Sequence, residues 1–159
     1  MTQKLRISLK RGSAMTVNRV AIGDSQLVYA ICADKKIKYP HGSSPVVYFG
    51  TTERGVDRIA ASAAYRAAEV LNIYGVKSFD VRIITCKSEP GVKSWKLLER
   101  ALLIGFRERF GATPKCNDKG RNMTPTREFD LFARDRIMRI ISDLTDHGQA
   151  ETHEIIEKA

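Results

Sequence analysis

The chain has 159 residues, 43% of them hydrophobic, which is enough for one domain with a sizeable core. No apolar run approaches the roughly 20 residues that a membrane-spanning helix needs. The first residues, Met1 to Gly12, alternate charged and apolar side chains, unlike a signal peptide. Three cysteines without a CxxC pair argue against a structural zinc site or a disulfide framework, and they fit a cytoplasmic protein.

The formal net charge is +9, from 27 Lys and Arg residues against 18 Asp and Glu residues. Such an excess favours a polyanionic partner, because nucleic-acid affinity begins with basic side chains that displace counterions from phosphates. Residues 1–20 contain five basic side chains and no acid, whereas the last twenty contain five acids and a single Lys. This asymmetry indicates one face for the ligand and another turned away from it.

The first half of the chain predicts strands. Segment 5–9 alternates apolar residues with basic or polar ones, which predicts an N-terminal strand with one basic face. Two short apolar runs, 27–32 and 46–50, predict buried strands. Between them, residues 34–45 are basic and rich in turn-forming residues, so we expect a loop or a wide hairpin there.

The second half is mostly helical. Residues 57–74 carry apolar side chains at helical spacing, with Gly75 placed to end the helix, and residues 79–86 predict another strand. Ser94 is the expected N-cap of a helix that Gly111 closes.

After a polar loop over 112–123, Thr124 and Pro125 are the expected start of a last amphipathic helix, and we expect the tail from Gln149 to be frayed. The whole order predicts an α+β domain over residues 1–159, built around a small, mostly antiparallel sheet flanked by helices. An extra N-terminal strand and a C-terminal helix would complete this domain.

Two short motifs on neighbouring predicted strands stand out. They read Leu27-Val28-Tyr29 and Tyr48-Phe49-Gly50. Arg58 follows in the first turn of the next helix, Glu99 lies inside a later helix, and Asn117 follows Pro114.

This ordered set resembles the GIY-YIG nuclease superfamily over residues 26–120, with 1–25 as a basic extension and 121–159 as a C-terminal helix and acidic tail. The resemblance implies a metal-dependent endonuclease that hydrolyses phosphodiester bonds in DNA with Mg²⁺ or Mn²⁺. The chain departs from the family pattern at Leu27, where a Gly is usual, at Thr51, where a Lys often follows, and at Ser62, where a His often stands. The basic insertion over 34–45 also lengthens the span between the two Tyr.

The roles follow from what the reaction needs. Glu99 would hold one divalent ion, because Mg²⁺ tolerates a single carboxylate and takes its other ligands from water and phosphate. Arg58 would bind the phosphate oxygens through its planar fork of donors. By the resemblance, Tyr29 is the general base or orients the water, Tyr48 hydrogen-bonds the water or the phosphate, and Asn117 fixes the loop or the metal-bearing helix.

Further residues are expected to help. His41 is a candidate active-site helper, and Trp95 is expected in the core. The basic residues expected to contact phosphates are Lys35, Lys36, Lys38, Arg54 and Arg66.

Two other functions stay open: a catalytically degenerate nucleic-acid-binding module with the same fold, and an interaction protein whose C-terminal helix docks on a partner. A chain this short resembles restriction or mobile-element nucleases more than a large repair subunit. A homodimer is expected, because cutting both strands with one site per chain is simplest with two chains. The target site, the choice of DNA or RNA and the polarity of the ends stay open.

Overall fold

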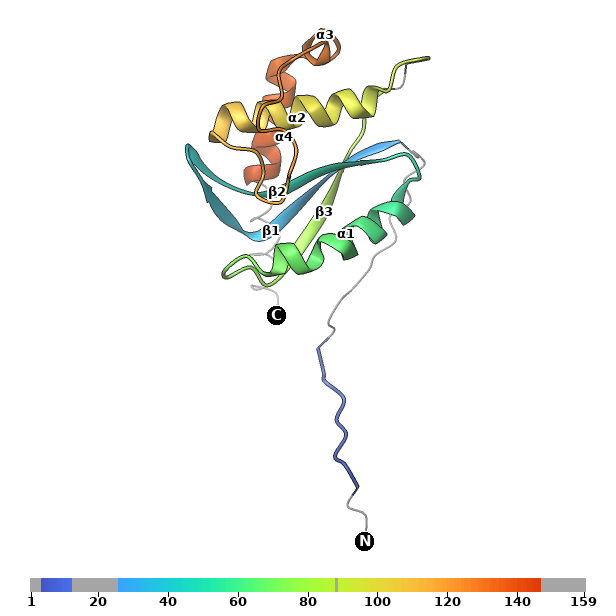
Figure 1. Ribbon diagram of the computed structural model, residues 1–159, viewed down its shortest axis with the longest axis vertical. Coiled ribbons are helices and arrows are strands. Elements are labelled where there is room, and N and C mark those ends of the chain that lie inside the picture. The colour runs from blue at the N-terminus through green and yellow to red at the C-terminus, as the bar shows by residue number, and fades with distance from the viewer. Residues whose placement is uncertain (1–3, 13–25, 88, 147–159) are drawn as a thin grey trace.

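The computed structural model describes residues 4–12, 26–87 and 89–146 of the chain (Figure 1). Within these ranges the elements are β1 (Leu27–Tyr39), β2 (Gly42–Thr52), α1 (Val56–Leu71), β3 (Phe79–Ile84), α2 (Ser94–Phe110), α3 (Glu128–Leu131) and α4 (Arg134–Asp146). The three strands pair antiparallel in the order β2-β1-β3. The predicted α+β domain around a small antiparallel sheet is therefore confirmed.

The domain has three layers. α1 covers one face of the sheet, and α2 and α4 cover the other (Figure 1). β1 lies in the centre, so residues 27–33 are buried on both faces, which explains why that segment is an unbroken apolar run rather than an alternating one. β2 forms one edge of the sheet, and this edge carries the candidate site.

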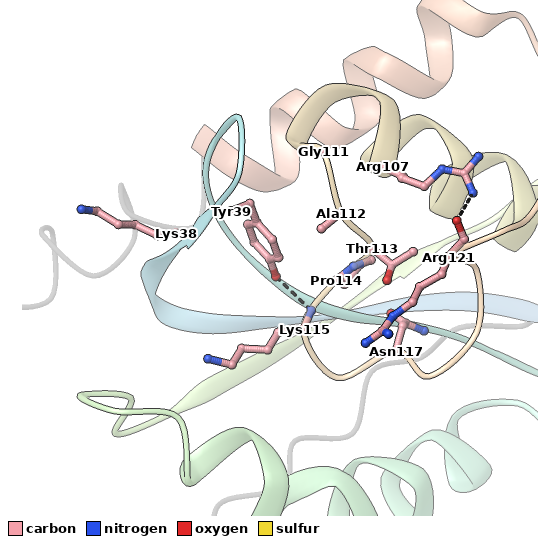
Figure 2. A pocket seen from close by; sticks show the side chains of 10 residues that line it. All are labelled: Lys38, Tyr39, Arg107, Gly111, Ala112, Thr113, Pro114, Lys115, Asn117 and Arg121. Carbon is pink, nitrogen blue, oxygen red and sulfur yellow. Dashed lines mark hydrogen bonds between the residues drawn. The ribbon is translucent and has the colours of Figure 1, made fainter.

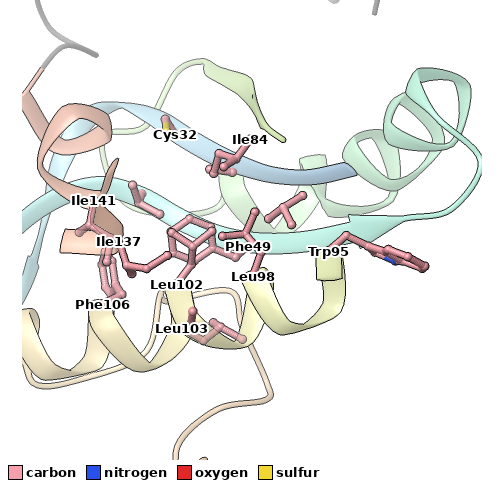
Figure 3. Close-up of a cluster of buried hydrophobic side chains, with 14 of the residues drawn as sticks. Cys32, Phe49, Ile84, Trp95, Leu98, Leu102, Leu103, Phe106, Ile137 and Ile141 are labelled. Carbon is pink, nitrogen blue, oxygen red and sulfur yellow. The ribbon is translucent and has the colours of Figure 1, made fainter. Parts of the chain in front are cut away.

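The larger core lies between the sheet and α2 with α4 (Figure 3). Phe49 of β2 meets Phe106 of α2 edge to face, with ring centroids 6.1 Å apart. α4 closes this core with Ile137 and Ile141, both almost fully buried. Trp95 is 7% exposed and belongs to the same core, as predicted.

The basic segment 34–45 is a hairpin, one of the two forms predicted, and its turn is tight rather than wide. β1 continues to Tyr39, β2 starts at Gly42, and only two residues form the turn between them. The backbone N–H of His41 donates to the carbonyl of Phe110 at 3.0 Å, which ties the turn to the end of α2. The exposed Lys36 and Lys38 flank the buried Ile37, which is the pattern of a strand with one solvent-exposed face.

The predicted N-terminal strand is wrong within the described residues. Segment 4–12 has no regular secondary structure, and Leu5, Ile7 and Leu9 are each more than 90% exposed. Alternation gives a strand only where a neighbouring strand accepts its hydrogen bonds. The described part of the sheet pairs β1 with β2 and β3 only.

At α1 and α2, two helix boundaries differ from the prediction and one agrees with it. α1 ends at Leu71, before Gly75, which instead forms the following turn with φ +79°. Ser94 is the first residue of α2 and Lys93 its N-cap, without a side-chain capping bond. Gly111 closes α2 in the left-handed conformation, as expected.

The C-terminal helix starts later than Thr124 and is split. α3 begins at Glu128, Phe132 is extended, and α4 starts at Arg134. The cause is the Glu128 carboxylate, which is fully buried and accepts hydrogen bonds from Arg100 at 2.5 Å and from the Thr126 backbone at 2.6 Å. The expected frayed tail from Gln149 lies outside the described residues.

The three cysteines are free. Burial raises the pKa of Cys32 to about 12 and that of Cys116 to about 11, so both thiols stay protonated and unreactive. In the described part of the chain, the helices are all too short or too polar to cross a bilayer.

Candidate active site

Gly50 brings the two motif tyrosines together. In the register of β1 and β2, Tyr29 stands opposite Gly50, and Tyr48 stands opposite Ile31. A Cβ at Gly50 would lie 2.6 Å from the Tyr29 hydroxyl and 2.7 Å from the Tyr48 ring, so only glycine fits here. The two rings lie 5.9 Å apart on the sheet face that α1 covers, and their hydroxyls are hydrogen-bonded to each other.

The two tyrosines differ in access. Tyr29 is 2% exposed, whereas Tyr48 is half-buried. Of the two tyrosines, Tyr48 is therefore the one that is accessible from the surface. Burial raises the pKa of Tyr48, the neighbouring Tyr29 raises it further, and Arg66 opposes both, so Tyr48 is a neutral hydroxyl at neutral pH.

Arg66 of α1 is the cation of this cluster. Its guanidinium carbon lies 4.5 Å from the centroid of the Tyr48 ring, and it hydrogen-bonds the Tyr48 hydroxyl. The same side chain pairs with Glu69 at 3.0 Å and donates to the carbonyl of Cys116 at 3.3 Å. Arg66 was expected to contact nucleic acid only, and the structure adds a contact with a motif tyrosine.

Glu99 reaches the same end of β2 from the other face. Its carboxylate accepts a hydrogen bond from the Thr51 hydroxyl, one residue after Gly50. Burial raises the pKa of Glu99, and the positive charges of Lys119 and Lys96 oppose this rise. A partly buried carboxylate that is incompletely compensated has room for a further positive charge.

Asn117 bonds the loop after α2 to the free edge of β2. Its amide donates to the carbonyl of Phe49 and accepts from the backbone N–H of Phe49, both at 2.9 Å. The N–H of Cys116 donates to the carbonyl of Val47 at 2.8 Å. The loop after α2 therefore covers this edge like a short added strand and stops it from pairing with another chain.

Arg58 lies near this end of β2 but does not touch the cluster. It is exposed in the first turn of α1, which starts four residues after β2 ends. Within the described residues, its guanidinium forms no hydrogen bond or ion pair with another side chain. Arg54, also exposed, lies between β2 and α1, and its backbone N–H donates to the Thr52 hydroxyl.

The expected helpers in the hairpin lie elsewhere. His41 is at the hairpin turn against Gly111, and at about 3.3 Å per residue the turn is roughly 20 Å along β2 from Tyr48. Lys35 lies over the Tyr74 ring at 5.6 Å, and Lys36 pairs with Asp146 at 3.9 Å. The structure therefore brings neither His41 nor these two lysines to the tyrosines.

Sequence reasoning missed Lys119 and the bonding role of Thr51. Lys119 is one of many basic residues in a polar loop, and only the folded loop brings it to Glu99. Thr51 stood out only as a departure from the family pattern.

The oxygen ligands that the structure brings together here are the Glu99 carboxylate and the Thr51 hydroxyl. Such hard oxygen ligands suit Mg²⁺. In the ranges that the structure describes, there is no group of three or more His, Cys, Asp or Glu side chains arranged to hold a metal. A metal here would depend on one carboxylate together with water and substrate oxygens, as the sequence predicts.

Comparison of the chain with protein-family models, with curated proteins and with solved structures finds no match. The case for a function therefore depends on the geometry at the end of β2.

Proposed function

We propose that the chain is a GIY-YIG-like, metal-dependent endonuclease that hydrolyses phosphodiester bonds in DNA. The supporting observation is that residues distant in the sequence meet at one end of β2. Tyr29 packs on Gly50, Glu99 bonds Thr51, and Asn117 bonds Phe49, so residues from three separate parts of the chain meet at three consecutive positions of β2. Arg58 stands in the first turn of the helix that follows.

The order of hydrogen bonds gives the tyrosines different tasks. Arg66 can only donate, so the Tyr48 oxygen accepts from it and the Tyr48 O–H is free to donate towards Tyr29. This polarity favours Tyr29 as the group that orients the attacking water and accepts its proton, while the Tyr29 O–H proton passes on to solvent. Tyr48, which is more exposed, hydrogen-bonds the phosphate.

The remaining groups handle charge. In the reaction, water adds to phosphorus, one P–O bond breaks, and the leaving oxygen takes up a proton. Arg58 neutralises the phosphate oxygens as charge builds on them. Glu99 and Thr51 would hold Mg²⁺, which when bound stabilises the charge on the phosphate and on the leaving oxygen.

Thr51 lies beyond Val47 and Phe49, the positions of the β2 edge that the loop after α2 bonds, so we place the phosphate at Thr51. The tyrosines lie on the α1 face, and Glu99 lies on the α2 face. A phosphodiester at the edge would contact both sets of side chains. We place this activity in the cytoplasm, where buried reduced thiols such as Cys32 and Cys116 are usual.

The deciding experiment is incubation of pure protein with supercoiled plasmid in Mg²⁺ or in EDTA. We expect nicking in Mg²⁺ only, lost in Glu99→Gln and kept in Glu89→Gln, a control that removes the same charge from an exposed carboxylate. If duplex binding persists but no nicking appears in Mg²⁺ or Mn²⁺, the protein is instead a binding module with a degenerate site.

A further inference from the structure

A cavity of about 530 Å³ lies beside the loop that follows α2, next to the β1–β2 hairpin (Figure 2). We call it the cationic cavity. It is lined by Lys38, Tyr39, Arg107, Gly111, Ala112, Thr113, Pro114, Lys115, Asn117 and Arg121. Four of these residues are basic and none is acidic. A concave surface with one sign of charge concentrates its field on an anion.

Arg107 stabilises the loop that forms one wall of the cationic cavity, and both terminal nitrogens of its guanidinium donate to that loop. Its guanidinium donates to three backbone carbonyls, those of Gly120 at 2.7 Å, Arg121 at 3.0 Å and Met123 at 2.6 Å. Figure 2 shows the bond to Arg121. These bonds hold the loop over 120–123 against α2. Arg107 therefore shapes the cavity and adds fixed positive charge to it.

The ligand-binding charge comes from the exposed Lys115 and Arg121, with Lys38 on the hairpin side. Among the described residues, the side chains of Lys115 and Arg121 have no acidic partner. The neighbouring Lys36 differs, because it is paired with Asp146.

The lining selects a phosphate rather than a base. Tyr39 is its single aromatic residue, and the Tyr39 hydroxyl is already bonded to the Val46 carbonyl and the Lys115 backbone. The Tyr39 ring is packed edge-on against Phe106, with centroids 5.1 Å apart. No free aromatic face is therefore offered for stacking on a base.

The cavity adjoins the candidate active site through one residue. Asn117 lines the cavity and also bonds both backbone groups of Phe49, next to Gly50. We propose that the cationic cavity holds a backbone phosphate of the DNA duplex that lies a few nucleotides from the one that is cut. This inference rests on the proposed function, and it adds Lys115 and Arg121 as the residues that set the position of the strand.

The test is a salt titration of fluorescence anisotropy on a labelled duplex, with cleavage blocked by the Glu99→Gln change. The cavity variant is Lys115→Ser with Arg121→Ser, and Arg107 is left intact to hold the loop. The matched control is Lys87→Ser with Lys93→Ser, which removes the same charge from exposed residues before α2. Because α2 has 17 residues, the control lies roughly 25 Å from the cavity.

Each phosphate contact contributes about 0.9 to the slope of log affinity against log salt. We expect the cavity variant to reduce this slope by about one to two, with equal effect on unrelated DNA sequences, and the control to reduce it by less than about 0.5. Equal slopes for both variants would overturn the cavity assignment while leaving the nuclease proposal standing. If the parent protein binds no duplex, both proposals fail.

Discussion

The sharpest test of the tyrosine cluster is the Gly50→Ala substitution. Its new methyl carbon would lie 2.6 Å from both the hydroxyl oxygen and the Cζ carbon of Tyr29, almost 1 Å inside ordinary van der Waals contact. Tyr29 is 2% exposed, so its ring has no solvent to move into and must displace its neighbours. Overpacking of this kind costs about 1–3 kcal/mol, which lowers Tm by roughly 3–12 °C in a domain of this size.

The expected loss of activity is larger than the loss of stability. A displacement of about 1 Å in a group that orients the reacting water can cost roughly 100-fold in rate. We therefore expect plasmid nicking by Gly50→Ala to fall about 100-fold at a temperature where the variant is fully folded, as checked by circular dichroism.

Gly105→Ala is the matched control. It adds the same methyl group between α2 and α4, 3.1 Å from Ile137 and Ile141, remote from the tyrosines. Alanine is favoured over glycine inside a helix by about 1 kcal/mol, which offsets the tighter packing. We expect wild-type nicking from this control. A wild-type rate in Gly50→Ala would refute the reasoning, because the tyrosine geometry would then be irrelevant to cleavage.

Three further outcomes are expected. Glu99→Gln should melt at a higher temperature than wild type at pH 7, because the raised pKa of Glu99 means that folding disfavours its charge. The difference in melting temperature should disappear below about pH 4, where the carboxyl is protonated in the unfolded chain as well. In the same thermal melts, Mg²⁺ should stabilise only the wild type. Arg58→Ala should lower the nicking rate by roughly 100-fold, with poor recovery in Arg58→Lys, and a Lys variant at full rate would remove Arg58 from the site. Glu128→Gln should cost about 3 kcal/mol at neutral pH by urea unfolding. Despite burial, Arg100 and Thr126 hold the pKa of Glu128 at about 2, so this stabilisation is present above about pH 4 and is lost as pH falls towards 2, and a pH-independent difference would contradict it.

Much of the fold could be predicted, because most elements carry their own periodicity. The apolar runs of β1 and β2, the helical spacing of α1 and the glycine that closes α2 each depend on local sequence. The errors occur where a distant contact decides. Segment 5–9 alternates like a strand but has no partner in the described sheet, and α3 is set by Arg100 reaching a buried Glu128.

For the candidate site, the sequence predicted the motif residues but not the contacts that other residues make with them. Tyr29, Tyr48 and Glu99 were predicted from their order along the chain, and the structure packs the two tyrosines together against Gly50. The contact between Arg66 and Tyr48 joins α1 to β2, and Lys119 approaches Glu99 from a loop. Neither pairing leaves a spacing signal, because both depend on how α1 and the loop after α2 dock on the sheet.

Two residues that depart from the GIY-YIG pattern, Thr51 and Ser62, have cations from other positions close by in the structure. Thr51 stands where a Lys is frequent. The Thr51 hydroxyl is bonded to Glu99, and Lys119 and Lys96 supply positive charge beside that carboxylate. Ser62 stands where a His is frequent. One helical turn further, on the same face of α1, Arg66 holds the Tyr48 hydroxyl.

In both cases the missing side chain is matched by a nearby cation from another position. An arginine at position 66 cannot shuttle a proton at neutral pH, because its guanidinium stays charged. It can only fix and polarise the tyrosine pair. The proton of the attacking water must then pass to a tyrosine or to solvent. Cleavage by the proposed reaction would therefore depend on the Tyr29 hydroxyl more strongly than it would in a site with a histidine.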